Sequence, residues 1–564
     1  MQNIKTATGS LVYSICQNTY KQYISGQSSY NEQIMKKIFF SLTFLLPFLL
    51  FGQTLSSDFK VTMAKPFQVV DAASKEYISL DNGFTISAKT HGEKVILQKF
   101  DVNGMEEVER KEYEDLEKYA KFQDLIRVKD RVYYIYEAFN KKYDNFTVYC
   151  REIDTETLKF NETKKLFKTK KEVIAPGNFW MTRNPNTKFS VTSSFDASKI
   201  MIYYRTKPES RNDKTNYDRL GFHVFDDLMD PIWGDEVKMP HTEANMNNLC
   251  YAVSKKGTAY MLARVNKTES FDLITVNAEG LENQKLEVKD GLIFDEFHLI
   301  ESPNGNVIAA GYYANGRDFK GGWGTAALSI NINGLYLFEI DQEGIIIREK
   351  EFPFSLELIN KYASERSKSK ATKREADGNA GINDLKIQET ILNEDGSLVV
   401  IGEVTYAREE FFGPQQVMVT HHGDMIITKI DENGEIAWQD KLPKNQACKS
   451  AETWNVASLG MSYIKGDGAH YVIFADNRKN ADLSINEAAE PHKGGYGGFL
   501  SAYKINDSDG TVEKHLILDL SDIDGQKAYQ FRVSRIFEAE DGTFLMEIYI
   551  KGKKDSIVKM ELVD

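Results

Sequence analysis

The chain has 564 residues, of which 41% are hydrophobic and 27% are charged, and its formal net charge is −13. A chain this acidic lacks the basic footprint that nucleic-acid binding requires, and it is poorly suited to direct adhesion to anionic lipid. The sequence contains no CxxC pair or Cys/His spacing typical of a zinc site, so we predict neither a metal nor another cofactor.

The N-terminal segment has the pattern of a targeting signal. Met35, Lys36 and Lys37 form a positive start, and residues 38–51 form an apolar run that ends before polar chain. This run is shorter than the about 20 residues of a membrane span and fits a secretory signal. We therefore expect residues 35–52 to be a signal peptide and residues 1–34 to be an upstream extension before the true start. The mature protein would then be residues 53–564, with no transmembrane span.

The signal segment, with its MKKIFF start at residue 35 and its Gly-Gln junction at residue 52, resembles the secretion signals common in Bacteroidota. This resemblance implies export to the periplasm or beyond the cell. Cys150, Cys250 and Cys448 follow the signal. Because an exported disulfide framework usually shows more cysteines and an even count, we expect these to be buried single thiols.

Two kinds of turn alternate along the rest of the chain. The first is an Asp-Gly or Asn-Gly hairpin between apolar runs, as in residues 82–83, 304–305, 395–396, 467–468 and 541–542. The second is an apolar strand that ends in Asp or Asn with Gly three residues later, as in residues 100–104, 276–280, 340–344 and 430–434. Looser copies begin at residues 154, 226 and 506, and a truncated copy ends at Asp564. Two hairpins per unit predict four antiparallel strands per unit.

Eight such units predict an all-β fold, a single β-propeller of four-stranded antiparallel blades. Eight blades are expected, with seven as the alternative. The last unit ends at Asp564 after its third strand, whereas residues 58–70 precede the first unit and look like a fourth strand. We therefore predict that the N-terminal strand completes the last blade and closes the ring.

The repeats resemble several broad groups, including quinoprotein-type DxxGxxxW repeats and bacterial propeller repeats of unassigned role. The full DxxGxxxW pattern occurs only at Asp431, Gly434 and Trp438. One full match among eight units does not support a quinone cofactor, so the resemblance implies a fold and no functional residue. Trp233 and Trp438 stand at matching offsets after their turns, and we expect both to pack between blades.

Length variation is confined to one kind of connection and so indicates the functional face. The two turn types are short, whereas the other connections are long. Because binding residues concentrate on variable loops held by a rigid scaffold, the long-loop face is the predicted functional face. The long connections are residues 166–190, 206–219, 314–330, 355–388, 406–423, 443–459 and 476–498. The segment 355–388 is charged and locally basic, and we expect a mobile loop or a short helix there.

Aromatic and histidine residues on these loops are the candidate binding residues. Trp323 and Tyr496 are flanked by glycines, which lets a flat ring project to contact a sugar or a peptide. His421, His422 and His492 are the other candidates, although adjacent histidines in an extended segment point to opposite sides and rarely share one metal ion. The alternative is that Trp323 and Tyr496 cap the central tunnel or pack on adjacent blades. The histidines would then lie in loops or at the rim of the tunnel.

No catalytic motif such as GxSxG or HExxH is present, and no carboxylate pair can be selected by spacing. The sequence therefore favours a monomeric, non-catalytic scaffold that binds a protein, peptide or glycan through its long-loop face. The alternative is a carbohydrate-active enzyme, a glycoside hydrolase or lyase, with carboxylates or histidines at the tunnel mouth.

Overall fold

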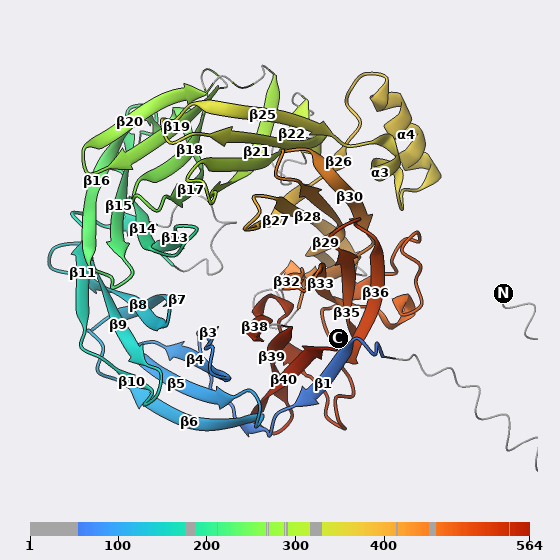
Figure 1. The fold of residues 1–564 in the computed structure, drawn as a ribbon, viewed down its shortest axis with the longest axis horizontal. Helices are drawn as coiled ribbons and strands as arrows, with labels where there is room; N and C mark the ends of the chain where they lie inside the picture. Colours follow the sequence, from blue (N-terminus) through green and yellow to red (C-terminus); the bar gives the residue numbers. More distant parts are fainter. Residues whose placement is uncertain are drawn as a thin grey trace, which may run out of the picture. The chain divides into compact units, whose positions relative to one another are not determined.

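A computed structural model describes residues 55–174, 187–210, 212–266, 268, 270–286, 288, 291–315, 330–412, 415–450, 458–540 and 542–563 (Figure 1). Strands dominate this part of the chain, and they pair antiparallel except for one short parallel pairing between β31 and β34. The prediction of an all-β, antiparallel fold is confirmed. The predicted upstream extension and signal peptide lie outside the described residues.

The described strands form eight sheets of four to six strands and a ninth of two. We number the larger sheets 1 to 8 along the chain. Sheet 1 contains β3 (Ser74–Ser79), β4 (Phe84–His91), β5 (Lys94–Asp101) and β6 (Glu106–Tyr113). Sheet 2 contains β7 (Ala120–Val128), β8 (Arg131–Asn140), β9 (Asn145–Asp154), β10 (Lys159–Phe160) and β11 (Lys164–Lys168). Sheet 3 contains β12 (Val173–Ile174), β13 (Ser190–Ser193), β14 (Lys199–Thr206), β15 (Tyr217–Asp226) and β16 (Pro231–Thr242).

The middle of the chain continues the series. Sheet 4 contains β17 (Met246–Val253), β18 (Ala259–Val265), β19 (Ser270–Asn277) and β20 (Gly280–Leu286). Sheet 5 contains β21 (Leu292–Glu301), β22 (Val307–Asn315), β24 (Gly334–Ile340) and β25 (Ile346–Pro353). The two-stranded sheet pairs β23 (Asn331–Ile332) with β26 (Ile382–Asn383).

The last three sheets complete the series of eight. Sheet 6 contains β27 (Leu385–Leu392), β28 (Leu398–Phe412), β29 (Gln415–Ile430), β30 (Ile436–Leu442), β31 (Gln446–Lys449) and β34 (His492–Lys493). Sheet 7 contains β32 (Ser462–Gly466), β33 (Ala469–Asp476), β35 (Phe499–Asn506) and β36 (Val512–Asp519). Sheet 8 joins β37 (Gln530–Phe531), β38 (Phe537–Glu540), β39 (Thr543–Ile550) and β40 (Lys554–Leu562) to β1 (Phe59–Met63) and β2 (Phe67–Gln68).

The repeated Asp or Asn of the second turn type has a local structural role. Its side-chain oxygen accepts hydrogen bonds from backbone N–H groups two to four residues later, as Asp341 Oδ1 does from Glu343 N at 3.0 Å and Ile345 N at 2.7 Å. The same bonds form at residues 101, 154, 226, 277, 431 and 506. Gly344, with a φ of 87°, then completes the turn in a left-handed conformation. The signature therefore recurs because it caps a turn in each of sheets 1 to 7.

Apolar clusters join each sheet to the next one along the chain. Seven of the eight clusters in the described residues draw most of their buried members from two consecutive sheets, for example Leu337 of sheet 5 and Val400 of sheet 6. One cluster contains Phe100 of sheet 1 and Leu545 of sheet 8, so the first and last sheets also share a core. Because each core has two sheets as its walls, no sheet buries its apolar faces alone.

The first described strand lies beside the last one (Figure 1). β1 pairs antiparallel with β40 over five residues, from Phe59 opposite Leu562 to Met63 opposite Val558. Phe59 is buried against sheet 7, where its ring centroid lies 5.7 Å from that of Tyr471. This pairing covers the edge of β40 that does not pair with β39.

The two matching tryptophans occupy matching places. The indole N–H of Trp233 donates to the carbonyl oxygen of Gly257 at 2.7 Å, and that of Trp438 donates to the carbonyl oxygen of Asp507 at 2.9 Å. Each bond runs from the outer strand of one sheet to a turn of the next, and both rings pack in the cluster between those two sheets. The expectation that these residues pack between repeats is confirmed. Cys150, Cys250 and Cys448 are buried and form no disulfide among the described residues, as predicted.

Helices are few in the described residues. α3 (Leu356–Asn360) and α4 (Glu365–Glu375) lie between sheets 5 and 6, and the 3-10 turns η2 (Glu243–Asn245), η3 (Arg478–Asn480) and η4 (Val533–Arg535) are single turns. Of the two alternatives for residues 355–388, a mobile loop or a short helix, the structure has helices. None of the helices in the described part of the chain has the length and apolar composition that a membrane crossing requires.

Phe59→Ala tests the role of the N-terminal strand. We expect it to lower the free energy of unfolding by about 3 kcal/mol, because it removes a buried ring and leaves a cavity between sheets 7 and 8. Thermal and urea unfolding of the two proteins measure this change. Lys60→Ala is the matched control, since the Lys60 side chain is 68% exposed and its ion pair with Glu561 is at the surface. Equal stability of the two variants would contradict the role assigned to β1.

Candidate functional site

The two longest strands in the described residues, β28 and β29, extend well beyond the rest of sheet 6. The sequence predicted a loop at residues 406–423, and this prediction is wrong. Residues 405–412 and 415–422 instead pair as a two-stranded ribbon, with Phe411 opposite Gln416 and Glu409 opposite Met418. The run of charged residues at 408–410 obscures the alternation that would have indicated a strand. We call these paired residues the ribbon.

Two short strands of sheet 6, β31 and β34, lie beside the base of the ribbon. β31 pairs with β29, and β34 of the following connection pairs with β31. In this arrangement His422 lies opposite Gln446, and Gln446 lies opposite His492. The structure therefore places these two predicted histidines in one row of a sheet, with one strand between them. Two strand spacings separate their backbones by about 10 Å.

His421 faces the opposite side of β29 from His422, as the alternation of a strand predicts. Its ring stacks on Tyr406 with centroids 4.7 Å apart, and its Nε2 lies 3.0 Å from Glu410 Oε1. Burial, together with the charge of Arg408, lowers the pKa of His421. The neutral imidazole thus acts as a link across the ribbon.

His422 belongs to a buried polar network at the ribbon's base. Its Nδ1 lies 2.7 Å from Glu403 Oε2, and Lys444 Nζ lies 2.5 Å from Glu403 Oε1. Lys444 also donates to Gln446 Oε1 at 3.0 Å, and Gln446 Nε2 donates to the carbonyl oxygen of Ala475 in sheet 7 at 2.8 Å. This network ties β31 to the rest of sheet 6 and to sheet 7.

The electrostatics of Glu403 show how strongly the network depends on its ion pairs. The Glu403 and Lys444 side chains are fully buried. Burial by itself raises the pKa of Glu403, but His422 and Lys444 outweigh it and lower the pKa to about 2. Glu403 is therefore a carboxylate at neutral pH, held by two partners, and its geometry is that of a structural anchor.

His492 is almost completely buried, and its Nε2 has no hydrogen-bond partner among the described residues. Burial lowers its pKa, so the ring is neutral. His422 is paired with Glu403, and strand β31 lies between His422 and His492. The two histidine side chains therefore do not converge on one point. In the described ranges no three His, Cys, Asp or Glu side chains come together in a way that would hold a metal ion.

Tyr496 is presented to solvent by a run of glycines. Its side chain is 43% exposed, and Gly494, Gly495, Gly497 and Gly498 all have positive φ. A side chain at Gly498 would put its Cβ 2.1 Å from the carbonyl oxygen of Asp476, so only glycine fits there. Trp323, the other predicted aromatic contact, lies outside the described residues.

The tip of the ribbon carries the most exposed large apolar side chain in the described residues. Phe411 is 75% exposed and Met418 is 43% exposed. Since Phe411 lies opposite Gln416, Met418 is its diagonal neighbour on the same face of the ribbon. Sequence reasoning missed both residues because it placed them in an irregular loop, where alternation of faces has no meaning.

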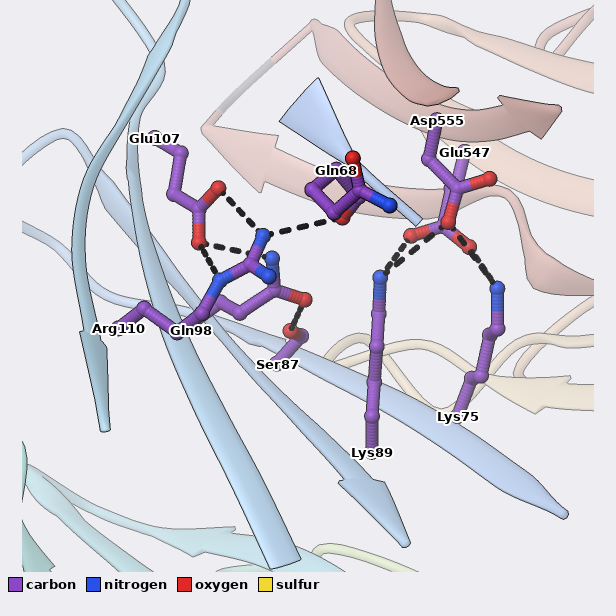
Figure 2. A network of polar contacts seen from close by, with 9 residues as sticks. All are labelled: Gln68, Lys75, Ser87, Lys89, Gln98, Glu107, Arg110, Glu547 and Asp555. Carbon is purple, nitrogen blue, oxygen red and sulfur yellow. Dashed lines mark hydrogen bonds and ion pairs between the residues drawn. The ribbon is translucent and has the colours of Figure 1, made fainter. Parts of the chain in front are cut away.

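A second buried charged cluster joins sheets 1 and 8 (Figure 2). Lys75 Nζ lies 2.7 Å from Glu547 Oε1 and 3.3 Å from Asp555 Oδ2, and Lys89 Nζ forms ion pairs with the same two carboxylates. The Lys89 side chain is fully buried and that of Asp555 is 1% exposed. We call these four residues the seam cluster. Its two positive and two negative charges balance, and no ligand is needed to neutralise them.

The electrostatics of the seam cluster are consistent with a structural role. Burial raises the pKa of Glu547, but Lys89 and Lys75 outweigh it and lower the pKa to about 2. Burial, with the nearby charge of Glu547, raises the pKa of Asp555. The ammonium group of Lys89 also lies 5.3 Å from the centroid of Phe67. Such a fully paired cluster positions sheets and offers no open site for chemistry.

A polar cavity of about 280 Å³ lies between sheets 6 and 7, on the face of the short turns. Asn393, Glu394, Asp395, Lys465 and Asp507 line it. One of these residues, Asp507, also contacts a histidine: its Oδ1 lies 2.7 Å from His470 Nε2. His470 Nδ1 in turn lies 2.8 Å from the Tyr463 hydroxyl.

This Tyr-His-Asp chain was not predicted, because its members come from separate elements and share no spacing. Burial raises the pKa of Tyr463 well above its ordinary value and lowers that of His470, so both side chains are neutral. Asp507 Oδ1 also bonds Lys429 Nζ at 2.6 Å. The chain is therefore held in place, and it links the two sheets beneath the cavity.

Lys89→Met tests the seam cluster. Removing one of two cations leaves Glu547 and Asp555 with a single buried partner, so we expect a loss of about 3–5 kcal/mol of unfolding free energy. Urea unfolding measures it. Lys94→Met on the same hairpin is the matched control, because its ion pair with Glu112 is exposed. A Lys89→Met protein as stable as the control would contradict the account of the cluster.

Glu403→Gln tests the network at the ribbon's base through pH. The folded-state pKa of Glu403, about 2, is below its ordinary value of 4.5. Its ionisation therefore stabilises the fold above pH 4.5, by about 3 kcal/mol, and this contribution is lost as pH falls from 4.5 towards 2. We expect the Gln variant to be less stable at neutral pH and to lose stability less steeply over that range. Parallel pH profiles for the two proteins would contradict the assignment.

Comparisons with known proteins leave the function open. No protein-family model matches the chain, and no curated protein matches it. Among solved structures it is similar to a polysaccharide lyase, Uly1, with 11% identity, 78% of this chain and 89% of that chain covered, and a TM-score of 0.36. The WD40 domain of SCAP from fission yeast is 6% identical, with 90% of this chain and 99% of that chain covered and a TM-score of 0.34. A prolyl endopeptidase gives 10% identity and a TM-score of 0.36 over 94% of this chain, which spans 61% of that protein. All three TM-scores are below 0.5, so these likenesses carry no argument about function.

Proposed function

We propose that the protein is an exported, closed eight-bladed β-propeller that acts as a binding scaffold for a protein or peptide partner. The eight larger sheets would be the blades, and β1 would complete the last of them. Three observations support the closed ring: the antiparallel pairing of β1 with β40, the apolar cluster shared by sheets 1 and 8, and the seam cluster between them. The pattern of residues 35–52 supports export.

The exposed apolar tip of the ribbon is the observation that carries the binding function. Phe411 and Met418 lie on one face of a two-stranded element that continues past the sheet. An aromatic ring and a methionine exposed together are typical of residues that anchor a protein interface. The ribbon belongs to the long connections, and the scaffold under it is rigid because Glu403, His422 and Lys444 fix its base.

The edge of β28 offers a second feature of such a site. β27 pairs with β28 only as far as Val404, and among the described residues no strand pairs with the outer edge beyond it. An extended peptide adds to an open edge through main-chain hydrogen bonds, and an adjacent apolar side chain then contributes specificity. Tyr496, on the same long-loop face, is a further contact residue in this proposal.

Phe411→Ser combined with Met418→Ser tests the proposal. The protein from Gln53 is immobilised and used to capture partners from periplasmic and culture fractions of the source cell, and a glycan array is probed in parallel. We expect a captured protein whose yield falls at least about tenfold with the double variant, because loss of interface anchors costs a few kcal/mol. Thermal unfolding should be unchanged, since both side chains are exposed.

The matched control is Ile345→Ser combined with Ile347→Ser, which removes two exposed apolar side chains, 56% and 53% exposed, near the start of the outer strand of sheet 5. Equal capture by both double variants would reject the ribbon as the binding surface. Binding to a glycan without a protein partner would reject the proposed partner class. Cleavage of an arrayed glycan would favour the carbohydrate-active alternative.

A further inference from the structure

Helix α4 is locally well specified. Ser364 is its N-cap, with a side chain that accepts a hydrogen bond from the backbone N–H of Ser367 at 3.3 Å. Glu365 lies in the first turn, and Lys373 and Arg374 lie in the last, which suits the helix dipole. Ala371 is the only buried residue of the helix, and it packs in the core between sheets 5 and 6.

Three asparagines hold the chain that follows α4. Asn315 Nδ2 donates to the carbonyl oxygen of Gly378 at 2.9 Å, Asn331 Nδ2 to that of Asn379 at 3.0 Å, and Asn333 Nδ2 to that of Ala380 at 2.6 Å. At the other end, the Tyr362 hydroxyl donates to the carbonyl oxygen of Lys441 at 2.8 Å. The helix is thus fixed at both ends to the sheets, although only one of its residues is buried.

The outward face of α4 carries an uncompensated row of cations. Arg366, Lys370 and Lys373 occupy positions i, i+4 and i+7 and therefore share one face of the helix. All three are exposed, and none forms an ion pair with a described residue. Lys368, on the flank, is instead paired with Glu365 at 2.9 Å. We call Arg366, Lys370 and Lys373 the cationic row. Like charges at this spacing weaken an isolated helix, so the row is a cost that the fold of α4 does not require.

The charge of the cationic row is opposite in sign to the net charge of the chain. The whole chain carries a net charge of −13, so most of its surface repels anions. The row spans about 10 Å along the helix axis, from the rise of 1.5 Å per residue. It is narrow, because Glu365 and Glu375 stand beside it at the two ends of the helix. The ligand that this geometry suits is therefore a single anionic strand.

Other anionic partners fit the row less well. A membrane-bound amphipathic helix needs a large apolar face, and the exposed residues of α4 are polar, apart from Ala376 at its C-terminal end. A globular acidic protein needs an apolar centre in its interface, and the exposed residues around the row supply no aromatic or large aliphatic side chain. Nucleic acid requires a far larger basic footprint than three side chains in a chain this acidic.

We propose that the cationic row of α4 binds an anionic polysaccharide, a glycan chain with carboxylate or sulfate groups along its length. Each cation meets one anionic group of a strand laid along the helix. Binding releases counterions, so the affinity falls as salt rises. This site is separate from the ribbon, and it would hold the scaffold on a charged glycan while the ribbon engages its partner.

Charge reversal of the row tests the proposal with dextran sulfate as the probe. The variant is Arg366→Glu, Lys370→Glu and Lys373→Glu, and titrations are run at several salt concentrations beside uncharged dextran. We expect wild-type protein to bind dextran sulfate and not dextran, with weaker binding at higher salt. The row variant should raise the dissociation constant at least about tenfold and flatten the salt dependence.

The matched control changes the same charge at scattered, exposed positions: Lys214→Glu, Lys285→Glu and Lys479→Glu. It should bind dextran sulfate within about twofold of wild type. Equal losses in the two variants would mean that overall charge governs binding and would overturn the proposal. No binding of dextran sulfate by the wild type, or equally tight binding of vesicles rich in anionic phospholipid, would also overturn it. Phe411→Ser with Met418→Ser should leave this binding intact, so failure of either proposal is seen separately.

Discussion

The contact between sheets 1 and 8 is the constraint on which the rest of the structure depends. The two sheets come from opposite ends of the described chain, and an apolar cluster joins them. The seam cluster joins them as well (Figure 2). The repeated sheets cannot do this by local pairing alone, because each needs a neighbour on both faces. β1 supplies the missing strand beside β40, and sheets 8 and 1 then bury each other's apolar residues.

Burying four charges at this contact is costly unless every one of them is paired. Lys75 and Lys89 are a cross-strand pair on β3 and β4, so their repulsion is tolerated only when Glu547 and Asp555 face them. An apolar contact accepts many registers, whereas this cluster accepts the one in which both carboxylates meet both ammonium groups. We infer that the charges help to specify which sheet packs against sheet 1.

The same principle operates at the base of the ribbon, with a different consequence. There Glu403 is held by His422 and Lys444, and the network supports an element that continues beyond the sheet. The buried ion pairs hold the base of the strand pair, and the tip of the same strand pair exposes a phenylalanine. The cationic row of α4 is presented in the same manner, since asparagine side chains fix the chain beside it.

Much of the fold was predictable because its rules are local. The turn residues, with their Asp or Asn side chain bonded to nearby backbone, recur wherever a hairpin requires them, and period-two alternation identified most strands. The ribbon was mistaken for a loop because Arg408, Glu409 and Glu410 interrupt the alternation, and only pairing with β29 makes these residues a strand. The sequence singled out the histidines as candidate binding residues from their chemistry alone. Their spacing along the chain could not show that a strand of a different connection, β31, separates His422 from His492.

The sequence by itself determined that the described part of the chain is all-β, where its hairpins turn, which tryptophans pack between repeats, and that Cys150, Cys250 and Cys448 are buried without a disulfide. These properties depend on a few neighbouring residues and on burial, which composition and periodicity report. Only the tertiary structure decided which charges meet, because Lys89 and Glu547 are 458 residues apart in the chain. It also decided which apolar side chains are left exposed. In the sequence, Phe411 cannot be distinguished from a buried phenylalanine, and only the packing around it shows that it is exposed. Partner and ligand surfaces are made of such residues, so they follow from packing and not from pattern.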